Sequence, residues 1–117
     1  MSPPELLPLG LDGVLIRFAT TWSEEANRAA QALAAALAAD PLPGQTEVAP
    51  GLGSVLLRFD RLATQRAEVL AALRHRLDGT PAAPVAARHW RVPACFGGIW
   101  GPDLAEAAAL AGRSESA

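Results

Sequence analysis

Hydrophobic and polar residues alternate in two short segments of the chain that are close copies of each other. Residues 10–18 recur 41 positions later as residues 51–59, and six of the nine positions are identical. Alternation of this kind is typical of a β-strand with one buried face. Chance similarity between two hydrophobic strands is the alternative. Because turn glycines, an arginine and a following helix cap share one offset, we interpret the segments as copies of a duplicated unit.

Each copy predicts a hairpin whose second strand covers residues 14–18 or 55–59. Glycine favours hairpin turns because it adopts positive φ, and four glycines are placed for this role: Gly10, Gly13, Gly51 and Gly53. Leu15 and Arg17 share one face of the first such strand. The apolar side chains on its opposite face are Val14, Ile16 and Phe18. The latter face is expected to be buried.

A helix is predicted over residues 24–39, after the first hairpin. Apolar residues recur there at helical spacing, namely Ala26, Ala30, Leu33 and Leu37. Ser23 is placed to cap its first turn, and Thr21 competes because Glu24 would complete a capping box with it. Asp40 and Pro41 should end the helix, since proline cannot continue the hydrogen-bond ladder.

A second helix is predicted over residues 65–77, with Thr64 as its cap and Gly79 in a left-handed conformation after its end. Its core side is expected to consist of Val69, Leu70, Leu73 and Leu77. The predicted fold is therefore α+β, a two-layer ββαββα sandwich in which both helices cover one face of an antiparallel sheet.

The composition changes after this predicted domain of residues 1–79. Residues 80–87 contain two prolines among small residues, which favours a linker. Residues 88–117 are predicted to begin a second domain, with a strand-like run over 88–95 and a short helix ending near Ala111. Pro102 suits the first position of that helix, and Asp103 places a carboxylate at its positive end.

Charge and composition exclude several classes of function. The net charge of −2 gives no attraction to nucleic acid or to an anionic membrane. All ten basic residues are arginine, so a P-loop lysine and Schiff-base catalysis are excluded. No apolar stretch reaches membrane-spanning length. A single cysteine, Cys95, suits a reducing compartment, and a cytoplasmic location is expected.

Residues 92–104 resemble a signature of the KipI family. They read Val-Pro-Ala-Cys-Phe-Gly-Gly-Ile-Trp-Gly-Pro-Asp-Leu, and the family's usual form ends in two glycines and then Gly-Pro-Asp-Leu. The N-terminal hairpin, residues 23–28 and the strand ending in Arg58-Phe59-Asp60 resemble the family too. The departures are Leu11, inserted where the family has aspartate directly after glycine, Phe96 in place of tyrosine, and Trp100 in place of phenylalanine.

This resemblance implies a relative of the smaller, B-type subunit of 5-oxoprolinase and of allophanate hydrolase subunit 1, which share carboxyltransferase subdomains C and D. It implies that a cyclophilin-like β-barrel follows Gly-Pro-Asp-Leu and that this chain holds only its truncated start. The expected function is that of a subunit, or a fragment of one, in an ATP-dependent hydrolase converting 5-oxoproline to glutamate. The chain alone is expected to be inactive and to bind no cofactor, with ATP used by the hetero-oligomeric complex.

The same resemblance implies a subunit-2 or subunit-C partner and, in the oxoprolinase, a third subunit. Two alternatives stay open: a KipI-like regulator that inhibits a sensor histidine kinase, and a non-catalytic remnant. Gene neighbours would separate the enzyme subunit from the regulator.

Candidate chemistry within the chain is sparse. His89 and Cys95 would fall on one face of a strand but far apart, so we interpret Cys95 as a partly buried structural cysteine, and no metal site is expected. Arg17 and Arg58 occupy equivalent repeat positions on a half-apolar face, which fits either partner packing or two solvated arginines. The glycine-rich turn either only permits the change from strand to helix or contacts a partner. The candidates for partner or interdomain contact are Arg17, Arg58, Phe96, Gly97, Gly98, Gly101, Pro102 and Asp103.

Overall fold

The computed structural model describes residues 2–79 and 86–116, which form two compact units, Met1–Ala86 and Ala87–Ala117. Most of the predicted linker, residues 80–85, lies outside the described residues.

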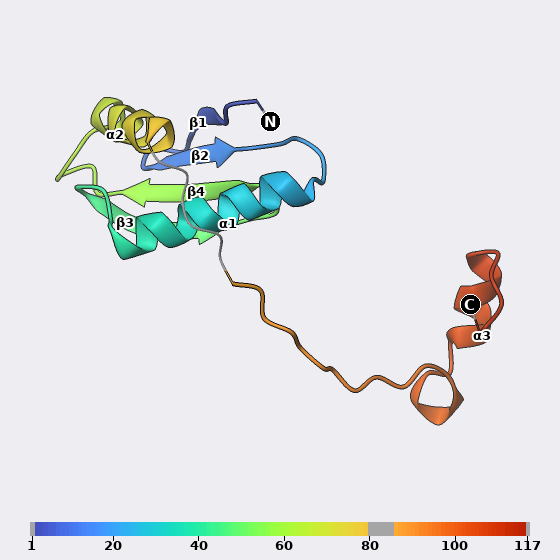
Figure 1. Ribbon diagram of the computed structural model, residues 1–117. Coiled ribbons are helices and arrows are strands. Elements are labelled where there is room, and N and C mark those ends of the chain that lie inside the picture. The colour runs from blue at the N-terminus through green and yellow to red at the C-terminus, as the bar shows by residue number, and fades with distance from the viewer. Residues whose placement is uncertain (1, 80–85, 117) are drawn as a thin grey trace. The chain divides into compact units, whose positions relative to one another are not determined.

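A four-stranded antiparallel sheet forms the first unit (Figure 1). Its strands are β1 (Glu5–Leu9), β2 (Gly13–Arg17), β3 (Gln45–Pro50) and β4 (Ser54–Phe59), in the order β1-β2-β4-β3. The two edge strands contain Pro8 and Pro50, and proline is tolerated at edges because no neighbour requires its missing N–H. The chain is thus α+β, as predicted.

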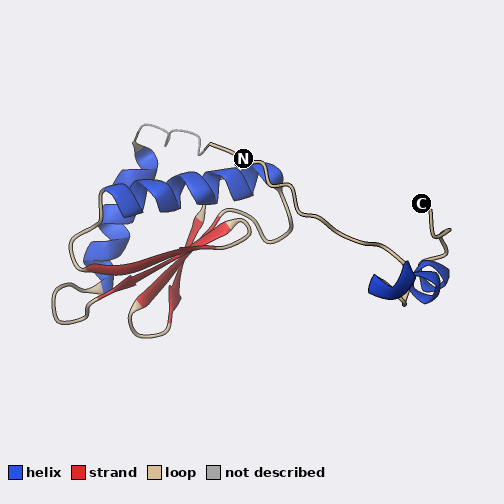
Figure 2. Ribbon diagram, turned by 90° about the horizontal axis from the view of Figure 1, so that it is seen from below, coloured by secondary structure: helices blue, strands red, loops and turns tan. Residues whose placement is uncertain are grey.

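Two helices, α1 (Glu24–Ala39) and α2 (Arg66–Asp78), lie over one face of this sheet (Figure 2). Ser23, not Thr21, caps α1, because its Oγ accepts a hydrogen bond from the Ala26 N–H at 3.2 Å. The helix ends at Ala39, with Asp40 as its C-cap, as the following proline predicts.

The core lies between the helices and the inward face of β2 and β4. All four side chains predicted for the inner face of α1 are buried, as are Val69 and Leu73 of α2. Leu70 and Leu77 are partly buried and pack against the same cluster. Sequence reasoning missed Leu42, which is only 7% exposed in the loop after α1. The remaining core side chains are Val14, Ile16, Ala34, Val55, Leu57 and Phe59.

The predicted ends of α2 were wrong. Gln65 is its N-cap, and the Thr64 hydroxyl instead donates a hydrogen bond to Glu68 Oε2 at 2.9 Å. Gly79 is extended, with φ −76°, so it does not adopt the left-handed conformation. Of the four turn glycines, Gly10 and Gly53 have positive φ, and the other two do not.

The second unit holds a short 3₁₀ helix, η1 (Gly98–Trp100), and α3 (Leu104–Leu110). The strand predicted over residues 88–95 was wrong, because those residues have no strand beside them to complete a ladder. Asp103 is the N-cap of α3, so Pro102 precedes the helix instead of opening it. No side chain of residues 86–116 is buried.

Candidate functional site

The outward face of the sheet carries an apolar row at its centre. Leu15 of β2 and Leu56 of β4 are direct cross-strand partners, and both are half-buried. Leu7 pairs with Leu15 on one side and Ala49 with Leu56 on the other. Paired residues of antiparallel strands project to the same side, so these four side chains cross the whole sheet on the face opposite the helices.

Arg58 lies at one end of this face and is held by carboxylates. Its Nε and Nη2 donate hydrogen bonds to Asp12 Oδ2 at 3.2 and 2.7 Å, and its Nη1 lies 3.5 Å from Glu47 Oε2. The hydrogen bond from Arg58 lowers the pKa of Asp12 below its ordinary value of 3.8, and the same bond raises the pKa of Arg58. The turn that carries Asp12 is itself fastened to α2, because Arg66 Nη2 donates to Gly10 O at 2.6 Å.

Arg17 lies at the opposite end of the β2–β4 pair. Its Nε donates to Glu5 Oε2 at 2.8 Å, and Nη2 lies 2.7 Å from the same oxygen. Arg17 faces Ser54 across the ladder, whereas Arg58 faces Gly13. The structure therefore keeps the two repeat arginines apart, each paired with an acidic side chain from a neighbouring strand or turn.

A glycine-dependent turn brings the other candidate residues together in the second unit. Gly97 has φ 95° and ψ −174°, a combination that is essentially restricted to glycine. A Cβ on Gly101 would lie 2.4 Å from the Gly97 nitrogen. The Gly101 N–H donates to Gly97 O at 3.1 Å and to Gly98 O at 3.3 Å. The backbone shape here excludes side chains at positions 97 and 101.

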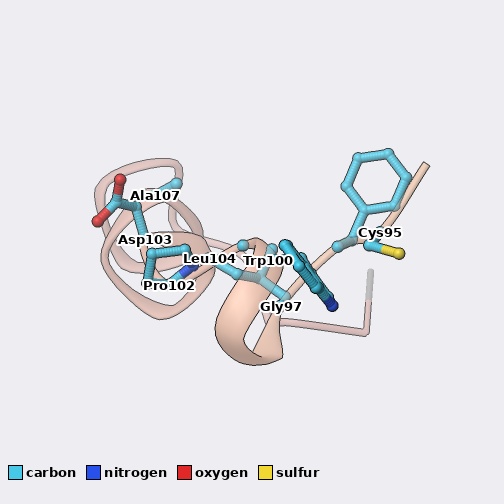
Figure 3. Close-up of a pocket in the computed structure, with 9 residues that line it drawn as sticks. Cys95, Gly97, Trp100, Pro102, Asp103, Leu104 and Ala107 are labelled. Atoms are coloured by element: carbon cyan, nitrogen blue, oxygen red, sulfur yellow. The ribbon is translucent and has the colours of Figure 1, made fainter.

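The turn shapes a hollow of about 330 Å³ that opens to solvent (Figure 3). Five of the candidate residues line it, but Gly98 does not. Sequence reasoning missed Trp100, Leu104 and Ala107 as lining residues; the last two lie one turn apart on α3, a signal that helical spacing could have supplied. The lining residues are Cys95, Phe96, Gly97, Trp100, Gly101, Pro102, Asp103, Leu104 and Ala107.

Sequence and structure comparisons identify the family. Residues 4–117 match the family described as carboxyltransferase domain, subdomain C and D. The chain belongs to this family. The domain occurs in the family of the smaller subunits of 5-oxoprolinase and allophanate hydrolase. No curated protein matched the chain.

The solved structures that resemble this chain include those of TTHA0988 and PH0987. TTHA0988 is 33% identical with a TM-score of 0.69, and the match covers 89% of this chain and 20% of TTHA0988. PH0987 from Pyrococcus horikoshii, described as a conserved uncharacterized protein, is 27% identical with a TM-score of 0.56, and the match covers 96% of this chain and 51% of PH0987. The chain thus spans about a fifth of one relative and about half of the other.

Metal-binding groups, the free cysteine and membrane-spanning helices were each sought among the described residues. Within residues 2–79 and 86–116, no group of three or more histidine, cysteine or acidic side chains is placed to hold a metal ion. Cys95 is free and exposed, so its interpretation as a partly buried structural residue was wrong. Within those same ranges, no helix has the length and apolar character needed to cross a bilayer. The hollow presents exposed apolar area, the free thiol of Cys95 and the carboxylate of Asp103.

Proposed function

We propose that this chain is part of a subunit of an ATP-dependent hydrolase resembling 5-oxoprolinase, and that it contributes binding surface instead of catalytic groups. The observation that carries this proposal is the family match over residues 4–117, which includes the Gly-Pro-Asp-Leu segment at 101–104. The chain contains no lysine, so a P-loop that binds the phosphates of ATP would have to lie in another part of the complex.

The proposal includes an architecture. The first unit is a duplicated ββα sandwich, and in longer relatives a β-barrel follows Gly-Pro-Asp-Leu. Support for the duplication comes from the centre of the sheet, where the repeat-equivalent Leu15 and Leu56 are direct partners. Arg17 and Arg58, also equivalent in the repeat, each lie opposite a glutamate on the adjacent edge strand, Glu5 and Glu47 respectively. A two-fold relation between the two ββα copies within the first unit accounts for both pairings.

The test is reconstitution with the predicted partners. The chain would be co-expressed with a subunit-2/subunit-C protein, and with a third subunit, from the same source, and the mixture assayed for ATP-dependent conversion of 5-oxoproline to glutamate. A stable complex with turnover, together with no turnover by the chain alone, is expected. A control without this chain shows whether turnover depends on it.

Two results would contradict the proposal. The first is turnover that is equally fast without the chain. The second is absence of a complex with the subunit-2 protein together with inhibition of a sensor histidine kinase, which would assign the chain to the regulatory class.

A further inference from the structure

The turn that joins β1 to β2 is bound at three of its backbone carbonyls. Arg66 Nη2 donates to Gly10 O at 2.6 Å, and Arg66 Nη1 donates to Gly13 O. The Phe59 N–H donates to Asp12 O at 2.9 Å. A turn that is bonded to the rest of the domain at three points opens less readily than one held at a single point.

Arg66 occupies a position that is electrostatically unfavourable for an arginine. It is the first residue of α2, where the partial positive charge of the helix dipole opposes a cation. Arg66 is half-buried, and its Cζ lies 5.6 Å from the ring centroid of the buried Phe59. The planar fork of a guanidinium can bind two carbonyls in a fixed geometry, which a lysine ammonium cannot do. These contacts offset the cost of a positive charge at this end of the helix.

The other ββα copy places a carboxylate where this guanidinium lies. The Phe18 N–H donates to Gly53 O at 2.9 Å, which repeats the backbone hydrogen bond just described at the offset of 41. However, α1 begins at Glu24 whereas α2 begins at Arg66, and an ionised carboxylate only accepts hydrogen bonds. The two equivalent turns therefore share one backbone hydrogen bond, and the guanidinium contacts belong to the turn beside α2.

We propose that Arg66 is a positioning residue: it clamps the turn over residues 10–13 to the start of α2 and thereby holds Asp12 in reach of Arg58 on the outer face of the sheet. The Asp12 carboxylate accepts hydrogen bonds from Arg58 Nε and Nη2 at 3.2 and 2.7 Å. The clamp thus connects the helix layer to the outer face, and the equivalent turn over residues 51–54 opens more easily. All of these residues belong to the first unit, so this role does not depend on the proposed function.

Amide hydrogen exchange compares the two turns within one molecule. The reporter amides, those of Phe18 and Phe59, both follow an arginine in the sequence, so their intrinsic exchange rates are the same. In the wild-type chain, the Phe59 amide should exchange at least about tenfold more slowly than the Phe18 amide, because hydrogen bonds from a charged donor raise the free energy of opening the clamped turn.

A matched pair of variants shows whether Arg66 causes this difference. Arg66→Met keeps an unbranched side chain beside Phe59 but loses both hydrogen bonds, so the exchange difference should fall to about threefold or less. Arg28→Met removes an arginine of α1 whose side chain is 77% exposed, and it should leave the ratio of the two exchange rates unchanged.

A titration of Asp12 tests whether the clamp acts on the outer face. The pKa of Asp12 is lowered chiefly by the hydrogen bond from Arg58, with a smaller effect of Arg61, so Arg66 affects it by placing the turn. The pKa of the Asp12 carboxyl, followed by NMR, should rise toward its ordinary value of 3.8 in both Arg66→Met and Arg66→Lys, since lysine keeps the charge but not the fork.

Three results would overturn the clamp. The first is equal exchange of the Phe18 and Phe59 amides in the wild-type chain, a comparison that decides the matter even if Arg66→Met does not fold. The second is an unchanged exchange ratio in a folded Arg66→Met chain. The third is a rise in the pKa of Asp12 that occurs in Arg66→Met but not in Arg66→Lys, which would assign the effect to the lost charge instead of the position of the turn.

Discussion

Leu57 and Leu56 are neighbours on β4 that lie on opposite faces of the sheet, so they test the fold directly. Leu57 is fully buried, pairs with Val14 and Val48 across the ladders, and belongs to the core cluster. Replacing a buried leucine by alanine costs about 2–5 kcal/mol because contacts are lost and a cavity remains. We expect Leu57→Ala to cost about 3 kcal/mol, since strands on both sides limit collapse of the cavity.

Leu56→Ala removes the same atoms from the half-buried outer face and is the matched control. It should cost about 1 kcal/mol or less, because water reaches that face. Urea unfolding followed by far-UV circular dichroism gives both values, and thermal melts should show a loss of about 12 °C or more for Leu57→Ala. Equal losses for the two variants would refute the assignment of the helices to one face of the sheet.

Three further predictions concern single contacts. Arg58 lowers the pKa of Asp12 below 3.8, so this ion pair stabilises the fold above that pH, and its contribution is lost as the pH falls through the pKa of the folded state. Between pH 6 and pH 3, the melting temperature of Asp12→Asn should therefore fall by less than that of the wild type. An identical fall for the two proteins would contradict the pairing. Ser23→Ala should cost about 1 kcal/mol in urea unfolding, and Thr64→Ala less, because Ser23 accepts a capping hydrogen bond from α1 whereas Thr64 is not the N-cap of α2. Gly44→Ala should cost about 1–3 kcal/mol, since Gly44 has φ +80° and a Cβ there would lie 2.5 Å from Thr64 Cγ2; Gly10→Ala, with positive φ but open space, should cost less in the same assay.

The hydrophobic pattern predicted the first unit well because strand alternation and helical spacing act locally. The strands β2 and β4, the bounds of α1 and the buried faces of both helices follow from it. The error at the start of α2 has a specific cause. The offset of 41 holds for the paired strands, but Ser23 and Gln65, the two observed N-caps, are 42 apart. Extrapolating the strand offset therefore placed the cap one residue early, at Thr64.

The same shift appears on the edge strands. Glu5 and Glu47 oppose the repeat-equivalent arginines and are also 42 apart, because the second hairpin turns with one residue fewer. Val14 pairs with Pro8, whereas its repeat equivalent Val55 pairs with Pro50, and 42 residues separate the two prolines. Sequence alignment at a single offset consequently could not show that each arginine has an acidic partner across the sheet.

In the second unit, the sequence predicted the glycine-rich turn but not the hollow beside it. The alternating run over residues 88–95 predicted a strand, yet a strand forms only beside another strand, and the local pattern contains no information on whether one is present. The hollow depends on the direction that the backbone takes after the turn, because that direction brings Trp100 and Leu104 to one site. Motif matching named Phe96, the glycines, Pro102 and Asp103, but it did not name Trp100, Leu104 or Ala107.

Removal of the residues after Ala86 is the last prediction and tests where the stability of the chain resides. Every buried hydrophobic side chain among the described residues falls between Val14 and Leu73. The two helix ends are further joined by Arg76, whose Nη2 lies 2.9 Å from Asp40 Oδ2. A chain shortened to end at Ala86 should therefore melt within about 3 °C of the full chain, since a shift of that size corresponds to less than about 1 kcal/mol in a body of this length.

The measurement is a thermal melt followed by circular dichroism, with the fluorescence of Trp22, the one tryptophan before Ala86, as a second probe. A decrease of more than about 5 °C would show that the later residues stabilise the fold, contrary to the burial pattern.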